Sequence, residues 1–127
     1  MRFKDKTVFI TGAAGGIGRQ TGLSFAKEGA NVAVSDLDFD MASRVAKEIK
    51  SAGGNAEPFK LDVTNQNETI ENMKNAYEHF GSLDIAFCNA GIREIVSPLE
   101  LSIEEWRKVI DINVTGVFIT AQTFAKH

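Results

Sequence analysis

TGAAGGIGRQ, residues Thr11–Gln20, packs four glycines and two alanines into ten positions. Glycine loses more backbone entropy on folding than any other residue, so such a cluster needs a compensating use. Three uses are open: a flexible linker, a tight turn, or a place where the backbone comes close to a large ligand. The segments on either side of the stretch decide among them.

Four short apolar runs are typical of buried β-strands. They are nearly continuous runs rather than alternations of polar and apolar residues, as expected for strands that are covered on both faces. The predicted strands are 7–11, 31–36, 56–63 and 83–89.

Apolar residues spaced three or four apart predict helices between and after these strands. The predicted helices are 16–28, a stretch around 41–49, 70–80, one that starts at Ser102 and one that begins near Asn113. Ser102 and Glu105 form a capping box at the start of the fourth helix. The side chains that we expect on the buried faces include Ile70, Met73, Tyr77, Phe80 and Trp106.

Strands that alternate with helices predict βαβ units and a parallel sheet. Pro58 cannot donate a hydrogen bond to a strand ladder, so the third strand is expected at an edge. The strand order 3-2-1-4 meets this condition and makes the first and fourth strands neighbours where the winding reverses. The predicted fold class is therefore a doubly wound parallel α/β sheet, whose ligands bind at this reversal, beyond the carboxyl ends of the strands.

The glycine-rich stretch runs from the first predicted strand into the first helix, at that reversal. A linker does not lie inside a βαβ unit, whereas a helix N-terminus offers unpaired N–H groups and a partial positive charge that suit a phosphate. In this interpretation Gly12 permits the tight turn, and Gly16 and Gly18 keep Cβ atoms away from a pyrophosphate. Gly22 lets the helix pack close to the sheet. A glycine turn without a ligand stays as the alternative.

The spacing of the glycines is T-G-x-x-x-G-x-G, because Thr21 stands where the common G-x-G-x-x-G pattern has its third glycine. With four further motifs in order, the sequence resembles the short-chain dehydrogenase/reductase family. These are Asp36 at the end of the second strand, LDVT at 61–64, NAG at 89–91 and Asn113 in DINVTG. A P-loop is excluded because no Gly-Lys-Ser/Thr follows the turn. A methyltransferase, the competing interpretation, has no place for NAG and DINVTG.

The resemblance implies a Rossmann-type fold and an oxidoreductase that moves a hydride between a nicotinamide and an alcohol or carbonyl carbon. Asp36 is expected to accept hydrogen bonds from the adenosine ribose, and Asp62 and Val63 to flank the adenine. A helix cap for Asp36 and a turn role for Asp62 stay as alternatives. The predicted cofactor-binding residues are Thr11, Gly12, Gly15, Gly16, Ile17, Gly18, Asp36, Leu37, Asp62, Val63, Asn89, Ala90 and Gly91.

The residues around Asp36 predict NAD rather than NADP. The extra phosphate of NADP would lie beside this carboxylate. Members of the family that prefer NADP usually carry a basic residue just before the middle glycine or just after the acidic position. Gly15 and Leu37 occupy these positions here, so nothing neutralises the phosphate.

Asn113 resembles the family's catalytic asparagine, whose backbone carbonyl holds a water that connects the catalytic lysine to solvent. A helix N-cap is the alternative. The family's serine and its Tyr-x-x-x-Lys pair are not found, because the single tyrosine, Tyr77, is followed by Gly81 where the lysine would be. We therefore expect a truncated amino-terminal part, residues 1–127, that lacks the carboxyl-terminal half of the domain and is inactive alone. A non-catalytic nucleotide-binding or interaction module is the alternative.

Composition excludes other function classes. The formal net charge is −3 and basic residues are scattered among acidic ones, which argues against a nucleic-acid partner. Cys88 is the single cysteine, so a reducing cytoplasm is expected. No apolar run reaches the roughly 18 residues of a membrane span, and no metal ligation is expected at His79 or His127. By resemblance, the partners are a small alcohol or carbonyl substrate and further copies in a dimer or tetramer.

Overall fold

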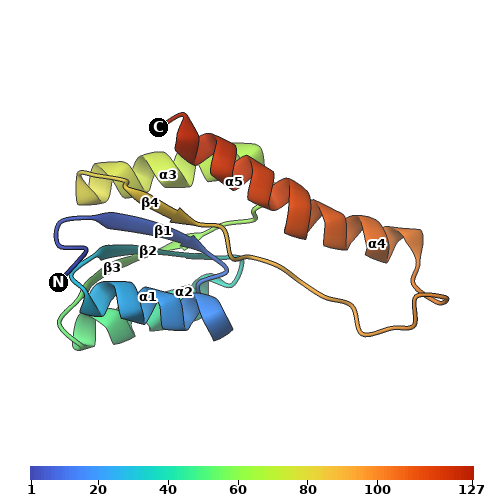
Figure 1. Ribbon diagram of the computed structural model, residues 1–127, viewed down its shortest axis with the longest axis horizontal. Coiled ribbons are helices and arrows are strands. Elements are labelled where there is room, and N and C mark those ends of the chain that lie inside the picture. The colour runs from blue at the N-terminus through green and yellow to red at the C-terminus, as the bar shows by residue number, and fades with distance from the viewer.

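A four-stranded parallel sheet in the order β3-β2-β1-β4 forms the centre of the molecule (Figure 1). It is seen in a computed structural model that describes residues 1–127. The strands are β1 (Thr7–Thr11), β2 (Asn31–Asp36), β3 (Asn55–Lys60) and β4 (Ile85–Phe87). The predicted fold class, the strand order and the edge position of the third strand are confirmed.

Helices cover both faces of this sheet (Figure 1). One face is covered by α1 (Gly16–Lys27) and α2 (Phe39–Ser51), and the other by α3 (Gln66–Phe80) and α5 (Gly116–Ala125). The remaining helix, α4 (Ile103–Ile110), extends away from the sheet. It begins with the predicted capping box, in which the side chains of Ser102 and Glu105 each accept the other's backbone N–H.

The core is divided by the sheet into two clusters, because successive residues of a strand face opposite sides. Val8 and Ile10 pack toward α1 and α2, together with Val32 and Ile49. Phe9 packs toward the other face, with Leu61, Val63, Met73 and two alanines. The sheet is therefore buried on both faces, as its nearly continuous apolar strands predict.

Strands β3 and β4 are shorter than the sequence predicts. β3 stops at Lys60 instead of residue 63, because its partner β2 ends at Asp36, directly opposite. β4 covers only Ile85–Phe87 instead of 83–89, the length over which it pairs with β1. Residues 61–63 and 88–91 thus leave the sheet as connecting segments.

The last two helices, which the sequence predicts as separate, are joined in the structure. A π turn, η1 (Asp111–Thr115), joins α4 to α5 without interruption. The residues at its two ends keep ordinary helical backbone angles, with φ of −63° at Ile110 and −62° at Gly116. Asn113 lies inside this turn, so it is not a helix N-cap. A π turn accommodates one extra residue in a helix and often lies at a functional site.

Three predicted core positions are exposed. On α3 the buried residues are Thr69, Met73 and Ala76, while Ile70 and Tyr77 are nearly half exposed. The buried stripe is therefore shifted by one position from the most apolar one. Trp106 is likewise 53% exposed, because α4 projects beyond the sheet and buries none of its residues.

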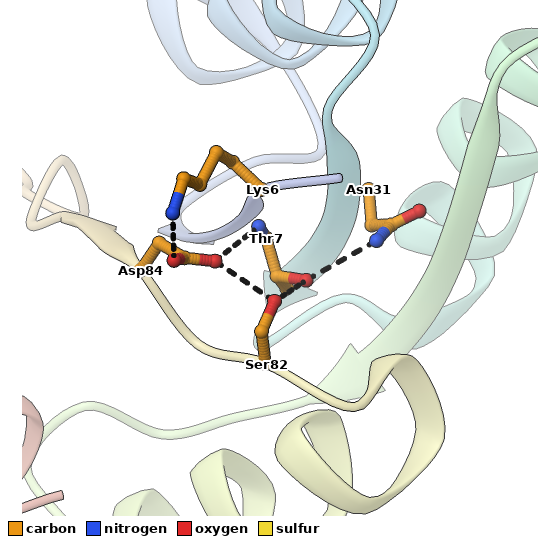
Figure 2. A network of polar contacts seen from close by, with 5 residues as sticks. All are labelled: Lys6, Thr7, Asn31, Ser82 and Asp84. Atoms are coloured by element: carbon orange, nitrogen blue, oxygen red, sulfur yellow. Dashed lines mark hydrogen bonds and ion pairs between the residues drawn. The ribbon is translucent and has the colours of Figure 1, made fainter. Parts of the chain in front are cut away.

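The amino ends of β1 and β4 are joined through Asp84 (Figure 2). Its carboxylate accepts hydrogen bonds from Lys6 Nζ and the Thr7 N–H, both at 2.9 Å, and from Ser82 Oγ at 2.8 Å. The hydrogen bond from Lys6, followed by that from Thr7, lowers the pKa of Asp84 below its usual range. The carboxylate is therefore held in its charged form.

The same network continues to the other two strands. Thr7 Oγ1 lies 3.0 Å from Ser82 Oγ and accepts a hydrogen bond from Asn31 Nδ2 at 3.3 Å. Asn31 Oδ1 accepts in turn from Asn55 Nδ2 at 2.8 Å. One row of polar side chains thus links the amino ends of all four strands.

Candidate functional site

A groove of about 280 Å³ opens at the carboxyl ends of the strands. The segments that follow all four strands contribute to it, because carboxyl ends of parallel strands meet at one edge of a sheet. The lining residues are Gly12, Asp36, Leu37, Leu61, Asp62, Val63, Ala90, Gly91, Ile92 and Ile112. The opposite end of the sheet carries the polar network of Asp84, so the groove lies at the end that the strand order predicts for a ligand.

Seven of the predicted cofactor-binding residues lie in this lining, and three further lining residues were missed. The missed residues are Leu61, Ile92 and Ile112. Leu61 and Ile112 stand inside the LDVT and DINVTG motifs, and Ile92 directly follows NAG. Their apolar side chains are typical of a core, which concealed their place at the groove.

The start of α1 differs from that of the other helices that follow a loop. Its N-cap is Gly15, which has no side chain to accept a hydrogen bond, whereas Asp38, Asn65 and Ser102 cap α2, α3 and α4. Gly15, Gly16 and Ile17 are exposed. The first N–H groups of α1 therefore have no side-chain partner, which is the arrangement that binds anions at helix N-termini.

The glycines of the loop are required for two different reasons. At Gly12 (φ +61°) an added Cβ would lie 2.8 Å from Ala90 Cα, and at Gly18 it would overlap the Gly12 carbonyl oxygen. Glycine at 12 and 18 is thus needed for packing within the chain. At Gly15 and Gly16 no atom lies within 4 Å of an added Cβ, so the space in front of them is open.

This geometry changes the explanation of two glycines. Gly18 was expected to make room for a pyrophosphate, but its contacts are with the chain itself. Gly22 was expected to allow close packing, yet an added Cβ would meet Val32 Cγ1 at 3.5 Å, an ordinary contact. Alanine would therefore fit at position 22.

Thr11 and Asn89 join the ends of β1 and β4. Thr11 Oγ1 accepts hydrogen bonds from the N–H groups of Asn89 and Ala90, both at 3.0 Å. Asn89 Nδ2 donates to the carbonyl oxygens of Thr11 at 3.2 Å and Gly12 at 3.1 Å. These two side chains face the chain itself, and they fix the loop against the segment after β4.

Asp36 connects the loop to the start of α2. Its Oδ2 accepts the Ala14 N–H and its Oδ1 accepts the Asp38 N–H, both at 3.0 Å. The helix cap is Asp38, whose side chain accepts the Met41 N–H, so the capping alternative for Asp36 is wrong. Each carboxylate oxygen has two lone pairs, and acceptor positions remain on both. No basic side chain pairs with Asp36, and the neighbouring Leu37 is 64% exposed.

Asp62 fulfils the turn role that the sequence left open. Its Oδ1 accepts the Thr64 N–H at 2.9 Å and the Thr64 hydroxyl at 2.7 Å. Its Oδ2 has no partner in the chain, so the turn role leaves one oxygen free for a ligand. Val63, the next residue, is buried beside Gly116 of α5 and also belongs to the groove lining.

Asn113 holds the segment that follows β4. Its Oδ1 accepts the Ile92 N–H at 2.8 Å, and its Nδ2 donates to the Ile92 carbonyl at 2.7 Å. Oδ1 would also lie 3.3 Å from a Cβ on Gly91. Both ends of the amide are therefore occupied by the backbone that forms one wall of the groove.

The groove lining contains carboxylates but no tyrosine, lysine, serine, histidine or cysteine. Tyr77 lies on α3, where its ring stacks against His127 with centroids 5.0 Å apart. No group of three or more His, Cys, Asp or Glu side chains is placed to hold a metal ion. None of the helices combines the length and the apolar character that a membrane crossing requires.

Comparison with known proteins agrees with this geometry. The chain is 42% identical over 118 residues to a cyclohexanol dehydrogenase of Acinetobacter sp. (strain SE19), which covers 92% of this chain and 47% of that protein. It is 35% identical over 122 residues to a 3-oxoacyl-(acyl-carrier-protein) reductase of Thermotoga maritima, which covers 96% of this chain and 50% of that protein. The chain thus spans about half the length of these curated relatives.

A solved structure and a family model support the same grouping. The crystal structure of a short-chain type dehydrogenase/reductase from Mycobacterium marinum superposes with a TM-score of 0.94 at 40% identity, over 98% of this chain and 50% of that one. The family model described as short chain dehydrogenase matches residues 6–127. The chain therefore belongs to the short-chain dehydrogenase family.

Proposed function

We propose that the protein to which this chain belongs is an NAD-dependent oxidoreductase. It moves a hydride between the nicotinamide and an alcohol or carbonyl carbon of a small molecule, and residues 1–127 hold the adenosine side of the cofactor. The observation that carries the proposal is the uncapped start of α1 beside a groove built from the ends of all four strands. Family membership supports the reaction class.

The residues of this chain fit a dinucleotide part by part. The open backbone at Gly15 and Gly16 would receive the pyrophosphate, which suits the free N–H groups of α1. The remaining acceptor positions of Asp36 would receive the ribose hydroxyls. Asp62 and Val63 would flank the adenine, the first with its free oxygen and the second with its apolar wall. Ile17, Leu37, Ala90 and Gly91 border the same path.

When bound, NAD supplies the carbon that accepts or returns the hydride. The residues of this chain bind and orient it, and Asn113 fixes the wall at Ile92. An amide neither gains nor loses a proton near neutral pH, so Asn113 does not act as the acid or base. We place the proton-transfer group of the reaction outside residues 1–127.

NAD is favoured over NADP by charge. The additional phosphate carries about −2 charges and would lie beside the Asp36 carboxylate, with no basic side chain to neutralise it. At about 5 Å and an effective dielectric constant of about 20, each unit of repulsion costs about 3 kcal/mol. One unit of this repulsion alone corresponds to roughly 100-fold in affinity, which is the smallest preference that we expect.

The test is a calorimetric titration of the complete protein with NAD and with NADP. Wild type is expected to bind NAD more tightly by at least about two orders of magnitude, and Asp36→Ala is expected to narrow the gap. Asp38→Asn is the matched control, because it removes the neighbouring charge while asparagine still caps α2. Equal or tighter binding of NADP by wild type would contradict the assignment.

The relatives suggest which substrates and which oligomeric state to test first. Two relatives are named for alcohols on a six-membered ring, cyclohexanol and cis-4-hydroxycyclohexanecarboxylate. We therefore propose ring alcohols as the first substrates to test, in a cytoplasmic dimer or tetramer. NADH production over a panel of cyclic and linear alcohols, with light scattering for the mass, checks both points.

A further inference from the structure

The turn at 61–63 forms one wall of the groove although it lies outside the sheet. β3 ends at Lys60, opposite the last residue of β2. Leu61 makes the last bond toward β2, from its N–H to the Asp36 carbonyl at 2.9 Å. No strand fixes the backbone from Asp62 onward, so its position depends on contacts from other elements.

Glu68, in the first turn of α3, holds this backbone from one side. Its Oε2 accepts the Asp62 N–H at 3.0 Å, and its Oε1 accepts from Asn65 Nδ2 at 3.3 Å. Asn65 caps the helix in return by accepting the Glu68 N–H at 3.1 Å. Because Thr64 occupies Asp62 Oδ1, Asp62 Oδ2 is the carboxylate oxygen of this cluster that has no hydrogen-bond partner in the chain.

Gly116, the first residue of α5, positions Val63 from the opposite side. A Cβ on Gly116 would lie 2.6 Å from Val63 Cγ2 and 3.1 Å from Val63 Cβ. Both residues are buried. The backbone of Gly116 is ordinary helix, with φ −62° and ψ −39°. Glycine is therefore needed here for the close approach of α5 to Val63 and not for its backbone angles.

We propose that Glu68 and Gly116 are positioning residues for the adenine end of the cofactor site. Glu68 places the polar contact that Asp62 makes with the edge of the adenine, and Gly116 places the apolar wall formed by Val63. Neither residue lines the groove. The inference rests on the proposed function, since it requires an adenine nucleotide in the groove.

The test of Glu68 compares two dinucleotides in titrations of the complete protein. Nicotinamide hypoxanthine dinucleotide lacks the adenine amino group that would donate to Asp62, so wild type is expected to prefer NAD. Glu68→Ala releases the Asp62 backbone, and this preference is expected to fall about fivefold, the equivalent of one hydrogen bond. Glu68→Gln keeps an acceptor for the Asp62 N–H and is expected to retain most of the preference.

Glu71→Ala is the matched control for Glu68. It removes a carboxylate about one turn further along the same helix. The Glu71 side chain is exposed and makes no hydrogen bond or ion pair. The preference for NAD is expected to stay at the wild-type value. If Glu68→Ala does not fold, Glu68→Asp replaces it, because its carboxylate is one methylene too short to reach the Asp62 N–H.

The test of Gly116 has a different signature. Gly116→Ala displaces Val63, which would contact the ring and not the amino group, so both dinucleotides are expected to lose affinity equally. In a Val63→Ala background the same substitution is expected to cost much less affinity, because the contact with Cγ2 is gone and only the 3.1 Å contact with Cβ remains. Gly22→Ala is the matched glycine control, with its nearest contact at 3.5 Å.

The outcomes separate this inference from the proposed function. An unchanged preference for NAD in folded Glu68→Ala, or equal affinity of wild type for both dinucleotides, would overturn the role of Glu68. An equal loss from Gly116→Ala with valine or alanine at 63 would overturn the role of Gly116. A wild-type protein that binds neither dinucleotide would overturn the proposed function itself.

Discussion

The glycines of the loop after β1 are of two kinds: some are required by close packing within the chain, and others face open space. Gly12 and Gly18 face backbone and side chain of their own chain, where a Cβ has no room. Gly15 has an extended backbone with φ −160°, which any residue can adopt, and open space in front of it. Substitutions at these positions therefore separate folding from binding.

Gly15→Val is expected to leave the melting temperature without NAD close to that of wild type, because neither its backbone nor its surroundings oppose a side chain. The added methyl groups would occupy the proposed pyrophosphate position, so the rise in melting temperature on adding NAD is expected to disappear. Thermal unfolding of the complete protein with and without NAD measures both effects. A normal rise with NAD would contradict the phosphate role of the loop.

Gly18→Ala is expected to show the opposite behaviour. Its Cβ overlaps the Gly12 carbonyl, and overpacking of this kind costs about 1–3 kcal/mol in the free energy of unfolding. Gly22→Ala, on the same helix but with ordinary contacts, is expected to be neutral or stabilising by up to about 1 kcal/mol. Urea unfolding compares the two, and equal stabilities would show that the close contact at Gly18 is unimportant.

At the scale of elements, the sequence predicts where strands start more reliably than where they end. β1 and β2 match the prediction because their apolar runs coincide with the pairing. The end of β3 is set by the end of β2 at Asp36, a property of the neighbour that no local pattern contains. Similarly, the buried stripe of α3 follows from how the helix sits on the sheet, which favours Thr69 over the more apolar Ile70.

The groove was predictable to the extent that its residues carry unusual chemistry. Glycines and carboxylates at strand ends indicated its place, since these types are rare in a core. Ile112 gave no such signal, because an isoleucine in a helical pattern is typical of packing. The bonds of Asn113 to Ile92 join positions 21 residues apart, and only the π turn in the folded chain brings them together.

Asn113→Ala is expected to loosen the segment that follows β4. The substitution removes both hydrogen bonds to Ile92, which are worth about 1 kcal/mol each. The Ile92 amide is therefore expected to exchange with solvent about 30-fold faster, while amides of β1 keep their protection. Hydrogen exchange followed by NMR measures this, and unchanged exchange at Ile92 would show that the segment is held by other contacts.

The junction of β1 and β4 at Asp84 predicts a pH dependence. Its pKa is lowered in the folded state, so the stabilisation is fully present above the unfolded value of about 3.9 and is lost as the pH falls through the folded pKa. Asp84→Asn is expected to cost about 1 kcal/mol at pH 7, reduced by the partial exposure of the pair with Lys6. Urea unfolding at pH 7 and pH 3 measures this effect. The difference in unfolding free energy between Asp84→Asn and wild type is expected to be smaller at pH 3.

At the scale of the whole molecule, residues 1–127 contain the groove of the proposed cofactor site but no tyrosine, lysine or histidine in its lining that could transfer a proton. Positioned acid–base catalysis contributes about 10²- to 10⁴-fold to a reaction rate, and the groove lining holds no tyrosine or lysine to provide it. We therefore expect no measurable NADH production by purified residues 1–127, and at most weak binding of the adenosine half of NAD. The complete protein assayed alongside is the control, and comparable turnover by the shorter chain would contradict the expectation.

The continuous helix of α4, η1 and α5 carries several exposed apolar side chains. Ile103, Trp106, Val114 and Phe118 are each more than half exposed along it. Exposed patches of this kind favour association, so purified residues 1–127 are expected to sediment as species heavier than the 13.8 kDa monomer. Phe118→Lys is expected to shift the distribution toward the monomer, and a monodisperse wild-type monomer would contradict the prediction.

The row of polar side chains from Asn55 to Asp84, of which Figure 2 shows the part from Asn31 to Asp84, lies at the opposite end of the strands from the groove. Its hydrogen bonds hold the amino rim of the sheet together, and none of them involves the carboxyl rim, where the groove lies. Substitutions at an exposed groove position such as Leu37 are therefore expected to leave these hydrogen bonds of the amino rim intact. For protein engineers this makes the carboxyl rim the place to diversify in a library, with the amino rim kept constant. In evolution, the same separation would allow new specificities to arise at the carboxyl rim at little cost to folding.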